Sequence, residues 1–366
     1  HALNFGGQRL DGSLTLRDTT ISGGYARYNG GGIVNYGTLT ILKSDVVNNV
    51  SDYGGGGIHS GGRLTITDST IAGNFSGRNS DYGPGGGIDT YGQAIITGST
   101  IMGNVSSGSY GSEGGGIAIS GQTTIIDSTI AENINWGTDS GGQGGGVWVG
   151  WGAEATISGS TIRDNVVHEF YEYEGCEYCY TIWPGYGGGL SNRGKTLLVN
   201  TTISGNESSV GGGLVNARQG ELTVMQSTIT ENSGGGIFSG RTYWLDNCST
   251  TTLRGTIVSG NTGDQIWFVP TPPGSDECYD ENYLPTNAVF NRDSFNVFGQ
   301  NGNAGLNGIS KGATDIVPSV GLNALLSPLA DNGGPTQTHA LPAGSPALDL
   351  APSGLCLAAP GNGDDQ

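Results

Sequence analysis

Two short motifs alternate along most of this chain, and their regularity restricts the fold more than any other feature. One is a run of three glycines followed by an aliphatic residue; the other is Ser or Thr, then Thr (Asp in one copy), then an aliphatic residue. The aliphatic positions of the first motif are Ile33, Ile58, Ile88, Ile117, Val147, Leu190, Leu214 and Ile237. Those of the second are Ile21, Val46, Ile71, Ile101, Ile130, Ile162, Ile203 and Ile229. The shortest spacings in these series, 23 to 25 residues, suit one solenoid coil of three short strands and three turns.

Composition also favours an elongated repeat protein. Glycine contributes 70 of 366 residues and hydrophobic residues only 34%, which argues against one compact spherical core. Alternating Ile, Val and Leu with Thr and Ser are typical of half-buried strands. We therefore predict an all-β protein in which residues 1–262 form a first domain, with about nine coils of a right-handed parallel β-helix over 10–262. Residues 263–366 are predicted to form an irregular, Pro- and Gly-rich capping region.

The coil that begins at Gly55 gives the expected register of the side chains. Because successive strand residues point to opposite faces, four aliphatic residues should point inward: Ile58, Leu64, Ile66 and Ile71. Three others should point outward: His59, Thr65 and Thr70.

An asparagine recurs three residues after the aliphatic residue of the second motif. The series is Asn49, Asn74, Asn104, Asn133, Asn165, Asn206 and Asn232. Stacked coils would align these amides into a structural ladder that satisfies the backbone groups of the turns. Four of them also lie in Asn-x-Ser sequons, which we interpret as a by-product of the repeat, although glycosylation elsewhere stays open.

Variation in length is concentrated between each of these asparagines and the next glycine run, so the insertions should emerge along one edge of the solenoid. The longest insertion spans residues 166–186. These segments carry a candidate binding ridge of aromatic residues: Tyr82, Tyr110, Trp136, Tyr173, Tyr178, Tyr180, Trp183 and Tyr186. Such rings could anchor the loops by packing on each other, or bind sugars or proteins.

Charge narrows the choice of partners. The chain has 32 acidic against 14 basic residues and a net charge of −18, so nucleic acid and anionic membrane surfaces should be repelled. No run of 18 apolar residues exists, so no membrane span is expected in this chain. It opens on "HALNFGG" without the features of a signal peptide, which indicates a removed leader or a late start.

Five cysteines lie in loop-like sequence, which favours disulfides in an oxidising compartment and an extracellular or cell-surface location. We expect Cys176 to pair with Cys179 and Cys248 with Cys278, which leaves Cys356 alone. The Cys-x-x-Cys spacing of the first pair also allows a redox site or half of a zinc site.

Catalytic and metal signals are weak. The outward position after the glycine motif holds one neighbouring pair, His59 and Asp89, which we interpret as an incidental surface contact and not as a general base with its carboxylate. Asp68 and Asp127 should be two coils apart, roughly 10 Å, which is too far for a retaining carboxylate pair. We predict no catalytic residues and no cofactor.

One acidic cluster provides a candidate calcium site, although such clusters are usually only solvated. Its members are Asp276, Glu277, Asp280 and Glu281.

The repeats over roughly residues 10–262 resemble bacterial right-handed parallel β-helix proteins, related in style to polymorphic outer-membrane and adhesin passenger repeats. Residues 327–350, "SPLADNGGPTQTHALPAGSPALDL", resemble the C-terminal segment of choice-of-anchor Q domain proteins, which are predicted surface or secreted bacterial proteins. In that family the segment commonly continues towards a last cysteine, whereas this chain stops at "GDDQ". The resemblance thus implies a missing tail and an unpaired Cys356.

Together these features predict a secreted or cell-surface β-solenoid with a structural or adhesive role. The first residues lead almost directly into Leu14 and Leu16 without a cap signal, so copies of the chain could join head to tail into filaments. The alternatives are a carbohydrate-active enzyme, such as a polysaccharide lyase or glycosidase, with its site in the 166–186 loop, and a carbohydrate-binding module that uses Trp183. Surface glycans are the expected external partners.

Overall fold

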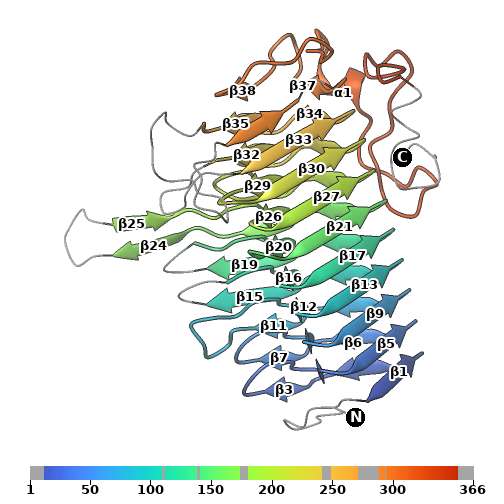
Figure 1. Cartoon of the computed structure of the whole chain (residues 1–366), viewed down its shortest axis with the longest axis vertical. Helices are drawn as coiled ribbons and strands as arrows, with labels where there is room; N and C mark the ends of the chain where they lie inside the picture. The colour runs from blue at the N-terminus through green and yellow to red at the C-terminus, as the bar shows by residue number, and fades with distance from the viewer. Residues whose placement is uncertain are drawn as a thin grey trace, which may run out of the picture.

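The chain winds into a parallel β-helix whose coils stack along one axis (Figure 1). The computed structural model describes residues 12–108, 112–137, 141–173, 180–240, 249–270, 288–292 and 294–352, without the side chains of 170–173 and 180–183. The predicted fold class, an all-β parallel solenoid, is confirmed, and α1 (Leu322–Leu325) is the only α-helix in the described residues.

Three long parallel sheets run the length of the stack. Sheet A contains β1 (Ser13–Arg17), β5 (Thr38–Leu42), β9 (Arg63–Thr67), β13 (Gln93–Thr97), β17 (Gln122–Ile126), β21 (Glu154–Ser158), β27 (Lys195–Val199), β30 (Glu221–Met225), β33 (Thr250–Arg254) and β36 (Val289–Asn291). Sheet B contains β2 (Thr20–Ser22), β6 (Asp45–Val47), β10 (Thr70–Ala72), β14 (Thr100–Met102), β18 (Thr129–Ala131), β22 (Thr161–Arg163), β28 (Thr202–Ser204), β31 (Thr228–Thr230), β34 (Ile257–Ser259) and β37 (Val297–Phe298). Sheet D contains β4 (Ile33–Asn35), β8 (Ile58–Ser60), β12 (Ile88–Thr90), β16 (Ile117–Ile119), β20 (Val147–Val149), β26 (Leu190–Asn192), β29 (Leu214–Asn216), β32 (Ile237–Ser239), β35 (Ile266–Phe268) and β38 (Leu306–Asn307).

A fourth, shorter sheet departs from the expected three strands per coil. Sheet C contains β3 (Tyr25–Ala26), β7 (Val50–Ser51), β11 (Phe75–Ser76), β15 (Val105–Gly108), β19 (Ile134–Gly137) and β23 (Val166–Val167). Each strand directly follows a position where the backbone turns, and several are only two residues long, too short to show a periodic pattern. The antiparallel hairpin of β24 (Phe170–Tyr173) and β25 (Tyr180–Trp183) projects from the stack on this side (Figure 1).

The core is a set of aliphatic columns inside the coils. Ile58, Leu64, Ile66 and Ile71 are all completely buried, as the alternating pattern predicts. Each pairs in register with a residue of the same column one coil away; Ile58, for example, aligns with Ile88. The same side chains therefore stack directly on one another along the whole solenoid.

The stacking continues beyond residue 262, where the sequence motifs end. Strand β35 extends sheet D, and residues 288–307 supply a tenth strand to each long sheet. The predicted boundary at 262 is therefore too early. Three phenylalanines fill the core of these last coils: Phe298 takes the position of Val258, whereas Phe268 and Phe290 pair in register with Ser239 and Thr251. The aliphatic motifs are therefore not repeated there.

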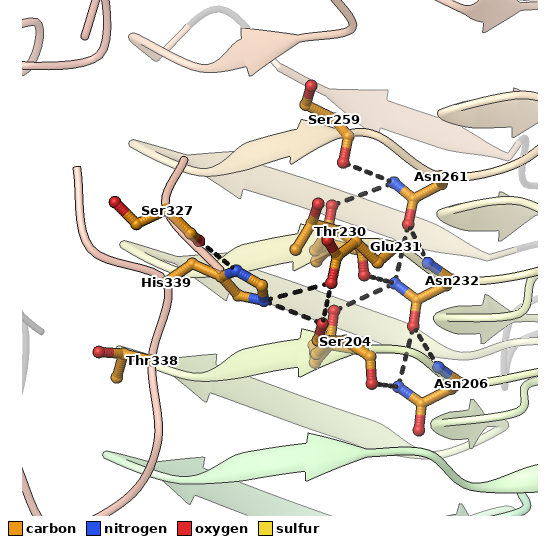
Figure 2. A network of polar contacts seen from close by, with 12 residues as sticks. Ser204, Asn206, Thr230, Glu231, Asn232, Ser259, Asn261, Ser327, Thr338 and His339 are labelled. Carbon is orange, nitrogen blue, oxygen red and sulfur yellow. Dashed lines mark hydrogen bonds and ion pairs between the residues drawn. The ribbon is translucent and has the colours of Figure 1, made fainter. Parts of the chain in front are cut away.

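The recurrent asparagines form a continuous buried ladder. In each step the side-chain nitrogen donates to the amide oxygen of the asparagine in the next coil, as Asn74 does to Asn104 at 2.9 Å. It also donates to a backbone carbonyl of the preceding coil, that of Val46 for Asn74. The ladder runs through Asn49, Asn74, Asn104, Asn133, Asn165, Asn206 and Asn232 and continues to Asn261 and Gln265 (Figure 2 shows its upper part).

A second ladder runs through the serine of the second motif and was not expected from the sequence. The Ser69 hydroxyl donates to the Thr67 carbonyl at 2.7 Å and accepts the backbone N–H of Ser44, one coil away. Equivalent hydroxyl contacts recur at Ser44, Ser99, Ser128, Ser160 and Ser227. These hydroxyls satisfy turn groups that burial would otherwise leave unpaired.

The C-terminal segment, residues 327–350, returns along the outer side of sheet B, opposite the hairpin (Figure 1). Its His339 is buried and lies between Ser204 and Ser327: Nε2 is 2.9 Å from the Ser204 hydroxyl and Nδ1 is 2.8 Å from the Ser327 carbonyl oxygen (Figure 2). Further along, Thr161 donates to the Gln337 carbonyl. We call residues 327–350 the C-terminal strap.

Candidate functional site

The outer face of sheet D carries the most varied chemistry of the described structure. Its central column consists of the outward residues of successive strands: Val34, His59, Asp89, Ala118, Trp148, Ser191, Val215 and Phe238. From His59 to Phe238 all of these side chains are buried, although they point away from the solenoid core. We call this surface, with the turns that border it, the sheet D face.

His59 and Asp89 form a buried hydrogen-bonded pair. They are register partners on β8 and β12, and His59 Nδ1 lies 2.8 Å from Asp89 Oδ2. Burial raises the pKa of Asp89, and the hydrogen bond and charge of His59 oppose this shift. The expected surface position of this pair is therefore wrong, because flanking residues enclose a column that the strand pattern alone places outside.

Two tyrosines enclose the imidazole. The Tyr36 ring contacts His59 edge-on with centroids 5.8 Å apart, and the Tyr91 ring lies at 5.6 Å. The Tyr36 hydroxyl is 3.4 Å from His59 Nε2. When the Nδ1–H of a neutral His59 donates a hydrogen bond to ionised Asp89, Nε2 can accept a hydrogen bond from the Tyr36 hydroxyl. The three side chains then form one connected chain of hydrogen bonds.

Glu113 and Arg193 add two partly buried charges to the sheet D face. Burial raises the pKa of Glu113 to about 7; the charge of Arg193 opposes the shift and that of Asp89 adds to it. Burial, reinforced by Arg218, lowers the pKa of Arg193 to about 10. Burial and the nearby carboxylates raise the pKa of Tyr91 to about 12. Such shifted groups on one face are typical of functional sites.

Exposed aromatic side chains border the face at the turn that leads from sheet D to sheet A. Tyr36 follows β4, Tyr91 follows β12 and Trp151 follows β20, so they occupy alternate coils. Their side chains are 44%, 54% and 76% exposed. This row was not predicted, because the variable loops that carry most of the aromatic residues emerge along another edge of the coil. Its signal in the sequence is an aromatic residue beside glycine in "NYG", "TYG" and "GWG".

Several buried polar atoms of this face lack a hydrogen-bond partner in the described structure. They are Asp89 Oδ1, Trp148 Nε1 and Arg193 Nε. A buried polar group without a partner costs about 1–3 kcal/mol. All three atoms are almost inaccessible to solvent, so they add to the cost of burying polar groups on this face and are closed to a ligand on its surface.

The predicted aromatic ridge is only partly described. Tyr82 and Trp136 are exposed, and the Trp136 ring lies 4.0 Å from that of His168. Tyr186 instead packs against Val215 and Phe238 at the sheet D face. Tyr110 and Tyr178 lie outside the described residues, as do the side chains of Tyr173, Tyr180 and Trp183.

The predicted disulfides and calcium site also fall outside the described residues. This applies to Cys176, Cys179, Cys248, Cys278 and Cys356, and to Asp276, Glu277, Asp280 and Glu281. Within the residues that the structure does describe, no group of three or more His, Cys, Asp or Glu side chains is arranged to hold a metal ion. In the same part of the chain, no helix has the length and apolar character needed to cross a membrane.

Asp68 and Asp127, the two carboxylates expected to be too far apart for catalysis, lie in turns and have a structural role. Both adopt positive φ, 48° and 50°, at the bend between sheets A and B. Asp and Asn tolerate this conformation better than most residues, and glycine replaces them at the same bend in other coils, as at Gly98.

The stacked parallel strands and internal ladders define a β-helix solenoid. The family model described as right-handed β-helix region matches residues 86–273, about half of the chain, and the chain belongs to this family. Comparisons with curated proteins and with solved structures found no significant match.

Proposed function

We propose that this protein is a structural or adhesive rod that acts at a cell surface or in the extracellular medium. The observation that carries the proposal is the in-register stack of three ten-stranded sheets, joined by the buried asparagine ladder. Such a stack resists bending and displays its outer residues at a regular spacing of about 4.8 Å along the axis. A rigid, periodic surface suits repeated contact with an extended partner.

We propose further that copies of the rod join head to tail. In the described part of the chain, β1, β2 and β4 each pair with another strand on one side only. Open parallel edges pair readily with another chain, and an axial contact between unlike ends continues into a filament because nothing closes it. The net charge of −18 disfavours side-by-side clumping of the rods.

Electron microscopy and light scattering of the full chain over a concentration series test this assembly. We expect filaments much longer than one solenoid. A folded globular domain fused before His1 should block growth, whereas the same domain inserted in the exposed loop at Ser80 should not. Single rods at the highest concentration would contradict head-to-tail joining.

A second candidate function is an enzyme that acts on polysaccharides, and one observation favours it. Glu113 has a pKa of about 7, and the charge of Asp89 contributes to this raised value. Asp89 is in turn hydrogen-bonded to the buried His59. A carboxyl group that is half-protonated near neutral pH can donate or accept a proton in catalysis.

A turnover assay on a polysaccharide panel separates the two functions. Turnover that is abolished in Glu113→Gln and His59→Ala, and kept in Glu132→Gln, would establish the enzyme. Glu132 is a suitable control because it is an exposed carboxylate on the outer side of another turn. Absence of turnover on every polymer would leave the structural and adhesive role.

A further inference from the structure

The exposed rings of Tyr36, Tyr91 and Trp151 all lie at the turn that leads from sheet D to sheet A. Tyr36 and Tyr91 directly follow their strands, whereas Gly150 holds that position after β20 and Trp151 lies in a turn that is two residues longer. The three residues follow β4, β12 and β20, and one strand of sheet D lies between each pair. With neighbouring strands about 4.8 Å apart, the backbones of Tyr36 and Tyr91, two coils apart, are about 10 Å apart along the axis.

Small residues in the intermediate coils leave room for these rings. Gly61 occupies the turn between Tyr36 and Tyr91, and a Cβ atom there would lie 2.9 Å from the Tyr36 ring. Ser120 occupies the turn between Tyr91 and Trp151. The Tyr36 ring therefore lies along the axis over the neighbouring coil, and does not simply extend into solvent.

Each ring is also held in place by a neighbour. Tyr36 and Tyr91 contact the buried His59 ring, and Trp151 Nε1 donates to Gln219 Oε1 at 3.3 Å. Rings that are already oriented lose little conformational freedom on binding. By contrast, Tyr28 and Tyr53 on adjacent coils stack on each other, with centroids 6.1 Å apart, so part of their surface is already used.

The chemistry beside the row suits hydroxyl groups. Glu113 and Arg193, both only partly buried, offer one acceptor and one set of donors. Flat apolar faces next to mixed donors and acceptors match sugar rings, which present C–H faces and a rim of hydroxyls. The strongly acidic chain disfavours a polyanionic sugar.

We propose that Tyr36, Tyr91 and Trp151 form a binding track for a neutral, extended polysaccharide that lies parallel to the solenoid axis. The proposal rests on the adhesive part of the function proposed above and names its partner class. One sugar ring stacks on each aromatic face, and other units hydrogen-bond to the partly buried Glu113 and Arg193 at the border of the sheet D face.

Affinity electrophoresis of the full chain in gels that contain a soluble neutral β-glucan, a neutral α-glucan, a mannan or polygalacturonate tests the track. At least one neutral polymer should retard the protein. Tyr91→Ala and Trp151→Ala should each weaken that binding by about tenfold or more. Tyr91→Phe keeps the ring and should keep most of the affinity.

Tyr28→Ala is the matched control, because Tyr28 is as exposed as Trp151, at 76%, but belongs to a different edge of the coil. It should bind like the unchanged protein, and thermal unfolding should show that all variants fold. Three results would overturn the track: no retardation by any neutral polymer, retardation by polygalacturonate alone, or equal losses in Tyr28→Ala and Trp151→Ala. None of these results bears on filament assembly, so the two proposals can fail separately.

Discussion

At the scale of single residues, the glycine run and the asparagine ladder depend on each other. Gly55 adopts a φ of +65°, Gly56 lies against the carbonyl of Gly86 in the next coil, and Gly57 faces the Asn74 amide. A Cβ atom on Gly57 would lie 2.9 Å from Asn74 Nδ2. The three glycines therefore serve three different needs: a left-handed turn, close stacking of backbones, and space for the ladder.

Replacement of Asn104 by Ala should destabilise the protein by about 1–3 kcal/mol, because in a buried site the Asn74 side chain would lose one of its acceptors and the Ile71 carbonyl would lose its side-chain donor. Chemical denaturation measures the free energy of unfolding. Asn307→Ala removes an exposed asparagine and should change it by less than about 0.5 kcal/mol. Equal effects of the two substitutions would contradict an energetic role for the ladder.

Glu113 should make stability fall as the pH rises. Its pKa is raised from 4.5 to about 7 in the folded protein, so between these values the folded state holds a proton that the unfolded state has released. The stabilisation is complete below about pH 4.5 and is lost as the pH passes through about 7. Melting temperatures from pH 4 to 8 should show a steeper decline for the unchanged protein than for Glu113→Gln. Parallel curves would rule out the raised pKa.

At the scale of elements, the C-terminal strap joins coils that lie far apart in sequence. Thr336 donates to the Gly159 carbonyl, Thr161 donates to the Gln337 carbonyl, and His339 reaches Ser204. Nearer the end, Leu325 and Leu326 pack with Val297 in a small separate core. A cavity of 610 Å³ lies between the strap and sheet B. The strap therefore depends on a few polar contacts and one apolar anchor.

His339→Ala should loosen the strap, because it leaves the Ser327 carbonyl and the Ser204 hydroxyl without the imidazole. We expect a loss of about 1–3 kcal/mol in the free energy of unfolding and faster proteolysis within residues 327–350. Gln337→Ala is the control, since that side chain is exposed and only two residues away. Unchanged cleavage in His339→Ala would show that the apolar anchor alone holds the strap.

At the scale of the whole molecule, the solenoid is a one-dimensional stack in which each strand of the three long sheets pairs only with strands of the neighbouring coils. Strand β13 pairs with β9 on one side and β17 on the other, whereas β1 pairs with β5 alone among the described residues. Stability in such a stack is close to a sum of coil terms and nearest-neighbour terms. The central coils should therefore open less often than the first coil.

Hydrogen exchange followed by mass spectrometry should show this gradient. We expect the amides of β13, β17 and β21 to exchange at least about tenfold more slowly than those of β1 and β2 when the protein is dilute. If copies join head to tail at higher concentration, protection of β1 and β2 should increase. Uniform exchange rates at low concentration would instead indicate one cooperative unit.

The sequence by itself determined the coil and its core. Every repeat contains the alternating aliphatic residues and the asparagine, so the local pattern and its period suffice to predict the core positions, for example Ile58, Leu64, Ile66 and Ile71. The serine ladder, the short strands of sheet C and the coils after residue 262 were missed, because their signals are single residues or two-residue strands, or consist of core phenylalanines in place of the repeated aliphatic motifs.

The tertiary structure alone decided the candidate site. His59 and Asp89 are 30 residues apart, and the burial of the His59 ring depends on Tyr36 and Tyr91, which belong to the two coils on either side of it. Burial then sets the pKa of Glu113, since that shift comes mainly from the loss of water around the carboxyl group. Insertions of variable length separate these residues in the chain, so their meeting on one face follows from the stacking of coils and not from any local pattern.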